Sequence, residues 1–122
     1  SLEGQRVLLV EDDFLVGLSL KTMLERMGCE VAGPFATADE AINRMNEHEV
    51  DIAVLDINIV GGTSTPVATR LAETRRPFVF VTGYQSPRSL LPDSLLERRR
   101  LDKPVDEESL RRCLIAAITD AA

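Results

Sequence analysis

Short apolar runs separated by amphipathic segments constrain the fold of this chain more than any other feature. Four consecutive apolar residues occur at positions 7–10, 52–55 and 78–81. Strands that are covered on both faces of a parallel sheet are apolar throughout, whereas strands with one wet face alternate. Because longer amphipathic segments follow these runs, the sequence predicts an α/β domain with a doubly wound parallel sheet.

The segments between these runs carry helix signals. Polar N-cap residues precede apolar residues spaced three and four apart, which is typical of amphipathic helices. The predicted helices follow the N-caps Asp13, Thr37, Thr65 and Asp106, and a short helix starts at Ser86-Pro87. Two further strands are predicted over residues 30–32 and 99–101, the second as an edge strand that tolerates charge. Five strands and five helices result.

Composition narrows the class of protein. The chain has 122 residues, the size of one domain, and a formal net charge of −6. This charge argues against a general nucleic-acid binder, because phosphate neutralisation needs a positive surface. No apolar run approaches the roughly 20 residues of a membrane span, and no signal peptide is visible. Cys29 and Cys113 lack metal-ligand spacing. We therefore expect a cytoplasmic domain with no nucleic-acid or membrane partner.

Polar residues follow the predicted strands at the edge of the sheet where ligands bind in open parallel sheets. They are Glu11-Asp12-Asp13 after the first strand, Asp56 after the third, Thr82 after the fourth and Lys103 after the fifth. Carboxylates this close repel one another unless a cation intervenes, and Mg²⁺ prefers carboxylate, water and phosphate oxygens. Asp56 is then placed to act as a nucleophile toward a phosphoryl group.

Each of these signals has an ordinary structural explanation when it is taken alone. Asp12 or Asp13 would be a helix N-cap, and Asp56 would be a loop acid after a strand. Thr82-Gly83 would be a turn, and Lys103-Pro104 a solvated lysine before a rigid turn. Four such signals in order, each at a strand end, favour a phosphoryl-binding site.

This ordered set resembles the receiver domain of the bacterial two-component response regulators, and the similarity covers nearly all 122 residues. The resemblance implies a flavodoxin-like (βα)5 fold with strand order 2-1-3-4-5. It also implies a Mg²⁺ site formed by Asp12, Asp13, Asp56 and the backbone carbonyl of Asn58. Residues 1–122 would then form one receiver domain, either free-standing or cut from a longer regulator or hybrid kinase.

The same resemblance implies a function. Asp56 would accept a phosphoryl group from a sensor histidine kinase or a phosphotransfer protein, and Thr82 and Lys103 would bind the phosphoryl oxygens. The domain would be part of a phosphorelay and would catalyse only its own phosphorylation and dephosphorylation. Phosphorylation would shift the loop after the fourth strand and the next helix, and so control a downstream protein of unknown identity. The chain would be a monomer or a phosphorylation-dependent dimer.

Two positions depart from the family's usual pattern. Arg100 stands three residues before Lys103, where the family usually carries an aromatic switch residue, and a guanidinium does not bury as a ring does. Val60 stands where many members have proline. Residues 77–84, with the sequence PFVFVTGY, resemble a subgroup that has Pro-Phe-x-Phe-x-Thr-Gly and lacks the switch aromatic. Tyr84 in this stretch and Arg100 are therefore the switch candidates.

Two other classes of protein fit the sequence less well, and a third stays open. A phosphatase of the haloacid dehalogenase type expects Asp-x-Asp, and here Asn58 follows Asp56 at that spacing. A flavodoxin needs a phosphate loop after the first strand, where residues 11–13 are acidic and would repel a phosphate. A degenerate receiver that binds a partner without phosphorylation stays open as the alternative.

Overall fold

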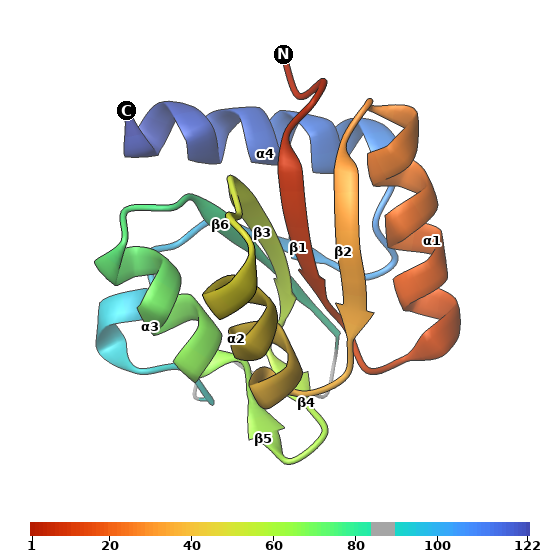
Figure 1. The fold of residues 1–122 in the computed structure, drawn as a ribbon. Helices are drawn as coiled ribbons and strands as arrows, with labels where there is room; N and C mark the ends of the chain where they lie inside the picture. Colours follow the sequence, from red (N-terminus) through yellow and green to blue (C-terminus); the bar gives the residue numbers. More distant parts are fainter. Residues whose placement is uncertain (84–89) are drawn as a thin grey trace.

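The computed structural model describes residues 1–83 and 90–122, and its centre is a five-stranded parallel sheet covered by helices (Figure 1). The strands are β1 (Arg6–Val10), β2 (Glu30–Phe35), β3 (Ile52–Asp56), β6 (Phe78–Thr82) and β7 (Arg100–Asp102). Their order is β2-β1-β3-β6-β7, and every neighbouring pair is parallel. The predicted α/β fold of the flavodoxin type is confirmed, with β6 and β7 as its fourth and fifth strands.

Four α-helices of the described residues pack on the two faces of this sheet. They are α1 (Phe14–Arg26), α2 (Ala38–Glu47), α3 (Thr65–Glu73) and α4 (Glu107–Ala121). Ile52 and Val54 of β3 belong to the core shared with α1 and α4, whereas Ala53 and Leu55 belong to the core shared with α2 and α3. Because successive strand residues face opposite sides and both sides are dry, the whole strand is apolar.

Helix N-caps follow the sequence prediction at three of the four positions. The side-chain oxygens of Asp13, Thr37 and Asp106 accept hydrogen bonds from backbone N–H groups three residues on, at 3.0–3.2 Å. The prediction for α3 was wrong by one residue: the N-cap is Ser64, because the helix already begins at Thr65. The side chains of Asp13, Thr37 and Asp106 supply acceptors for N–H groups that have no partner within the helix, whereas the Ser64 side chain makes no such hydrogen bond.

The boundaries of two strands also differ from the prediction. β2 continues to Phe35 past the predicted end at residue 32, with a register irregularity between Leu8 and Val10 of β1. β7 lies one residue later than predicted. A small hairpin of β4 (Asn58–Ile59) and β5 (Gly62–Thr63) follows β3 and was not predicted, since two-residue strands carry no periodicity.

The region after β6 bears on two further predictions. The predicted helix at Ser86-Pro87 and the switch candidate Tyr84 lie outside the described residues. After the gap, a short 3-10 helix, η2 (Asp93–Leu95), leads to β7. Among the described helices, none combines the length and the hydrophobicity needed to cross a membrane.

Candidate functional site

The carboxyl ends of four strands bring polar side chains to one edge of the sheet. β1, β3, β6 and β7 are parallel neighbours, so each of them ends at this edge. The residues found there are Glu11, Asp12, Asp56, Thr82 and Lys103. The strand ends thus gather carboxylates, a hydroxyl group and an ammonium group.

Glu11, Asp12 and Asp56 form a compact group of carboxylates. One oxygen of each side chain lies within 4.8 Å of the other two. Glu11 and Asp56 are buried, with 3% and 4% of their surface exposed, whereas Asp12 is exposed. Glu11 is fixed from two directions: its Oε2 accepts a hydrogen bond from the Asp13 N–H at 3.1 Å, and its own N–H donates to the Phe35 carbonyl at 2.9 Å.

The ammonium group of Lys103 is the cation that balances this group. Its Nζ lies 2.8 Å from Glu11 Oε1 in an ion pair and donates a hydrogen bond to Asp56 Oδ2 at 3.2 Å. The β6–β7 pairing positions the lysine, because its backbone N–H donates to the Thr82 carbonyl at 2.8 Å. Two buried carboxylates therefore share one cation.

The pKa values of the site reflect this crowding. Burial, followed by the neighbouring Glu11 carboxylate, raises the pKa of Asp56 from its ordinary 3.8 to about 7, and Lys103 opposes this rise. Burial lowers the pKa of Lys103, but hydrogen bonds and charges from Glu11 and Asp56 outweigh it and raise the pKa overall. Asp56 is thus poised between its protonated and ionised forms near neutral pH, whereas Lys103 stays charged.

The structure brings Glu11, and not the predicted Asp13, into the group with Asp12 and Asp56. Asp13 is exposed, and its carboxylate is turned toward the Val16 N–H as the N-cap of α1. Strand alternation is the signal that the sequence analysis missed. Continued one residue past Val10, it places Glu11 on the same face of the sheet as Leu9, which is also the face of Asp56.

The other predicted site residues occupy different surroundings. Thr82 is buried at the end of β6, and its hydroxyl donates to Asp102 Oδ1 at 3.3 Å. Asn58 is exposed on β4, where it pairs with Thr63 of the hairpin. Arg100, the other switch candidate, is half-buried on β7. The roles of these residues stay predictions.

The donor set fits a hard divalent cation. Asp56 Oδ1 is buried and accepts no hydrogen bond from any described residue, so it is a free ligand atom. Mg²⁺ is bound through a few carboxylates and keeps several waters, and the exposure of Asp12 leaves room for water and phosphate oxygens. A divalent ion would also offset the repulsion between the Glu11 and Asp56 carboxylates, which contributes to the raised pKa of Asp56.

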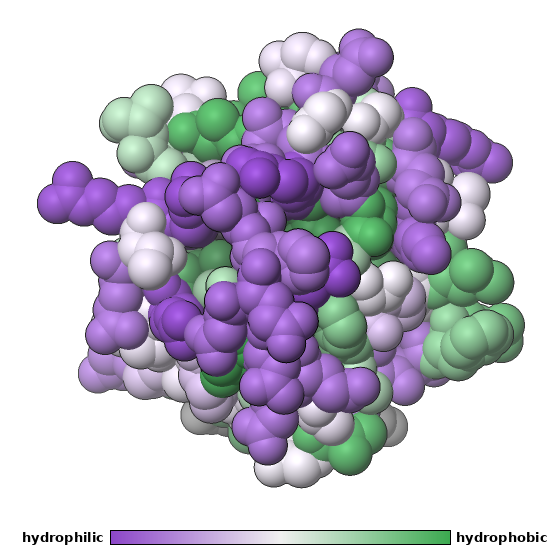
Figure 2. Space-filling model, viewed as in Figure 1, coloured by the Kyte–Doolittle hydropathy of each residue, from purple (hydrophilic) through white to green (hydrophobic). Residues whose placement is uncertain are grey.

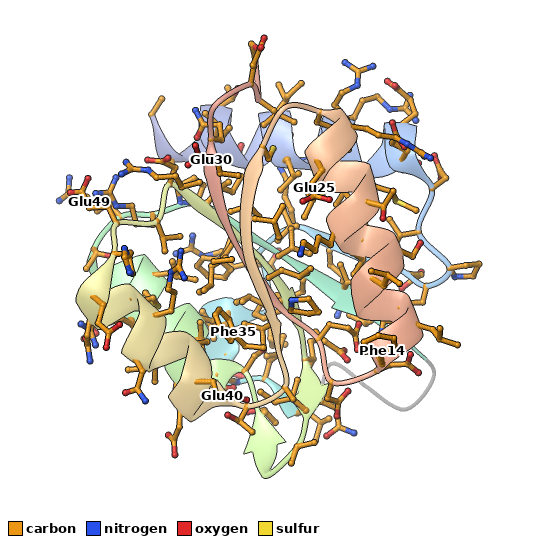
Figure 3. All side chains as sticks on the ribbon, turned by 45° about the vertical axis from the view of Figure 1, so that its right-hand side comes forward. Phe14, Glu25, Glu30, Phe35, Glu40 and Glu49 are labelled. Atoms are coloured by element: carbon orange, nitrogen blue, oxygen red, sulfur yellow. The ribbon has the colours of Figure 1, made fainter. Side chains whose placement is uncertain are left out.

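An apolar surface lies next to this site. Phe14 and Leu15, at the start of α1, are 74% and 73% exposed, and Leu18 one turn further is 49% exposed. Figure 3 shows Phe14 projecting outward from the start of α1, and Figure 2 shows hydrophobic side chains at the lower right of the molecule, where α1 begins. Leu15 also lines a groove of about 410 Å³ whose wall includes Lys103. Exposed apolar side chains of this kind mark interaction surfaces.

Comparison with known proteins places this geometry in a family. The family model for the response regulator receiver domain matches residues 7–114. The transcriptional regulatory protein PdtaR of Mycobacterium tuberculosis (strain H37Rv) is 30% identical over 81 residues, which are 66% of this chain and 40% of the relative. The chemotaxis protein CheY of Thermotoga maritima is 36% identical over 56 residues, which are 46% of this chain and 47% of CheY.

Solved structures agree with this placement over almost the whole chain. The solution structure of SdrG from Sphingomonas melonis Fr1 has a TM-score of 0.81 and 32% identity, and covers 98% of both chains. The receiver domain of a modulated diguanylate cyclase from Desulfovibrio desulfuricans G20 has a TM-score of 0.84 and 30% identity, and covers 98% of this chain and 97% of that one.

The chain belongs to the response regulator receiver domains of two-component systems. It spans less than half the length of the curated relatives described above. A receiver is a signalling domain.

The raised pKa of Asp56 predicts a pH-dependent stability of the metal-free protein. A carboxyl whose folded pKa lies above its unfolded value stabilises the fold at low pH and loses this contribution as the pH rises from about 4 to about 7. Asp56→Asn removes the titration. In urea unfolding at pH 8 without divalent ions, we expect the variant to be more stable than the wild type by about 1–3 kcal/mol.

The matched control is Asp39→Asn, which removes one exposed carboxylate from the first turn of α2. Its difference from the wild type should be small and nearly constant between about pH 5 and about pH 8, whereas the wild type and Asp56→Asn should diverge over this range as Asp56 ionises. A wild type and an Asp56→Asn variant with parallel stability curves over this range would contradict the account of the site.

Proposed function

We propose that this receiver is phosphorylated on Asp56. The observation that carries the proposal is the position of the Asp56 carboxylate, which is buried at a strand end and bound by Lys103 beside two further acids. A surface acid after a strand would have neither the burial nor the paired cation. This set matches what phosphoryl transfer to a carboxylate requires: a fixed nucleophile and positive charge beside the oxygens that become negative.

The reaction follows from the positions of these groups. In its ionised form, one oxygen of Asp56 attacks phosphorus, a new P–O bond forms, and the bond from phosphorus to the donor's leaving atom breaks. Lys103, now 3.2 Å from Asp56 Oδ2, is close enough to pair with an oxygen of the transferred group. The ionised fraction of Asp56 grows as the pH rises through its pKa of about 7.

Glu11, Asp12 and Asp56 are the side chains that would hold Mg²⁺, and the family resemblance adds the backbone carbonyl of Asn58. When it is bound, Mg²⁺ supplies positive charge to the phosphoryl oxygens during transfer. Glu11 takes the place that the sequence analysis gave to Asp13. Burial, the hydrogen bond from the Asp13 N–H and the ion pair with Lys103 orient the Glu11 carboxylate, so this ligand is preorganised, while Asp12 stays accessible to solvent.

The donor is a sensor histidine kinase or a phosphotransfer protein that docks on α1. A donor protein has to bring its phosphohistidine to within bonding distance of Asp56, so it must contact the surface around the site. Phe14, Leu15 and Leu18 form an exposed apolar surface there. Leu15 and Lys103 line the same groove, so this surface is continuous with the site. Burying these side chains would supply binding free energy without adding charge to an acidic site.

The output is a shift of the region after β6, which controls a downstream protein. A phosphoryl group on Asp56 binds Thr82 and Lys103 only when it is present, and such differential contact is what a population shift requires. The alternative, a degenerate receiver that never accepts a phosphoryl group, would leave the buried acids and Lys103 without a chemical role.

Incubation with acetyl phosphate and Mg²⁺, followed by intact mass, tests the proposed chemistry. The wild type is expected to gain one phosphoryl mass, and Asp56→Asn to gain none. Glu11→Gln keeps the shape of the side chain but removes a ligand charge, so the Mg²⁺-dependent rate should fall by at least about tenfold. The matched change Asp13→Asn should leave the rate within about twofold, because Asp13 lies outside the carboxylate group.

A wild type without an adduct would support the degenerate receiver instead. A rate that depends on Asp13 and not on Glu11 would contradict the ligand set.

The docking surface makes a separate prediction. Leu15→Ala should slow transfer from a phosphorylated phosphotransfer protein that loads the wild type by about tenfold, because an apolar contact is lost. Phosphorylation by acetyl phosphate needs no docking and should stay within about twofold of the wild type. Ile115→Ala is the control, since Ile115 is an exposed apolar residue on α4. Equal effects of the two substitutions on protein-mediated transfer would contradict docking on α1.

A further inference from the structure

The Thr82 hydroxyl donates its hydrogen bond to Asp102, a residue that has no role in the proposed function. Only 6% of Thr82 is exposed, and its hydroxyl donates to Asp102 Oδ1 at 3.3 Å. A threonine hydroxyl has a single proton, so it donates to one acceptor at a time. An ionised carboxylate only accepts, and hydrogen bonds to charged acceptors are stronger than those to neutral ones.

The sheet itself holds the two side chains together. Thr82 and Asp102 are register partners at the last pair of the β6–β7 ladder. Partners in register carry their side chains on the same face, so the contact is built into the backbone pairing. The next backbone bond, from the Lys103 N–H to the Thr82 carbonyl at 2.8 Å, extends this ladder by one step and fixes the position of Asp102.

Phosphorylation would create a second acceptor for the same proton. Asp56 is the register partner of Val81, the residue before Thr82, so a group attached to its carboxylate forms on the neighbouring strand. The oxygens of a phosphoryl group are strong acceptors with more charge than one carboxylate. The Thr82 hydroxyl then has two competing acceptors, one on each neighbouring strand, and one proton to donate.

We propose that Asp102 is the resting-state acceptor of the Thr82 hydroxyl, and that phosphorylation of Asp56 moves this hydrogen bond from Asp102 to the phosphoryl group. The inference rests on the proposed function. Asp102 thereby opposes activation, because its hydrogen bond has to break first. Threonine is β-branched and has few side-chain rotamers, so the move is a jump between discrete positions, as a two-state switch requires.

The exchange also changes the surface of the protein. Asp102 is exposed, so the exchange releases an unpaired carboxylate at the end of β7. Position 100 on β7 carries a half-buried arginine, so there is no aromatic ring at this position that could swing inward behind Thr82. The release of Asp102 is a change that a partner detects at the end of β7 without an aromatic relay.

The test uses the full chain with Mg²⁺ and beryllofluoride, a phosphoryl mimic that binds carboxylates without covalent transfer. The backbone amide resonance of Val81, the register partner of Asp56, reports half-saturation in every variant, and the methyl resonance of Thr82 reports its resting position wherever Thr82 is present. Asp102→Ala should lower the beryllofluoride concentration at half-saturation by about fivefold, the effect of one hydrogen bond no longer competing. Asp102→Asn, a neutral acceptor, should fall between Asp102→Ala and the wild type.

A double-mutant cycle separates the hydrogen bond from simple charge repulsion, which also weakens when Asp102 is removed. In a Thr82→Val background there is no proton to compete for, so Asp102→Ala should leave half-saturation unchanged. Asp39→Asn controls for the change in net charge and should match the wild type.

An equal effect of Asp102→Ala in both backgrounds, or none in either, would overturn the assignment of Asp102. A wild type that does not bind beryllofluoride at all would overturn the proposed function together with this inference.

Discussion

The contact of Lys103 with two buried carboxylates is the interaction on which the rest of the site depends. Glu11 and Asp56 are almost fully buried, and without the ammonium group 2.8 Å and 3.2 Å away their charges would be unbalanced at the edge of the sheet. Removing one partner of a buried pair costs more than the pair itself contributes, because a charge remains. The parallel strands determine which residues meet there, since each contributes the side chain at its carboxyl end.

Much of this arrangement could be predicted from the sequence, because it follows from strand ends. Uniformly apolar runs locate β1, β3 and β6, and the residue after each run must lie at the ligand edge of the sheet. Asp56 and Thr82 are predicted in this way, whereas Lys103 follows a strand that was predicted as a charged edge strand. Glu11 lies directly after the first apolar run, but the family resemblance assigned metal binding to the acidic pair Asp12 and Asp13. The decisive information was alternation within the strand, which is a property of the backbone rather than of the motif.

The contact between Thr82 and Asp102 shows where such reasoning ends. Asp102 is an ordinary acid in sequence, 20 residues from Thr82, and only the register of β6 against β7 makes the two residues neighbours. The β4–β5 hairpin is similar, since its strands have two residues each and no pattern of their own. Both features arise from pairing across the fold. Family membership gives the fold and the general class of signalling domain, while such local contacts distinguish one receiver from another.

The central claim is that Glu11, Asp12 and Asp56 hold a divalent ion beside the nucleophile. An anomalous difference map from crystals grown with Mn²⁺, which accepts the same oxygen ligands as Mg²⁺, tests it most directly. The account predicts one strong peak about 2.2 Å from an oxygen of each of these three side chains. A peak coordinated by Asp13 in place of Glu11, or crystals without a peak at this edge of the sheet, would contradict it.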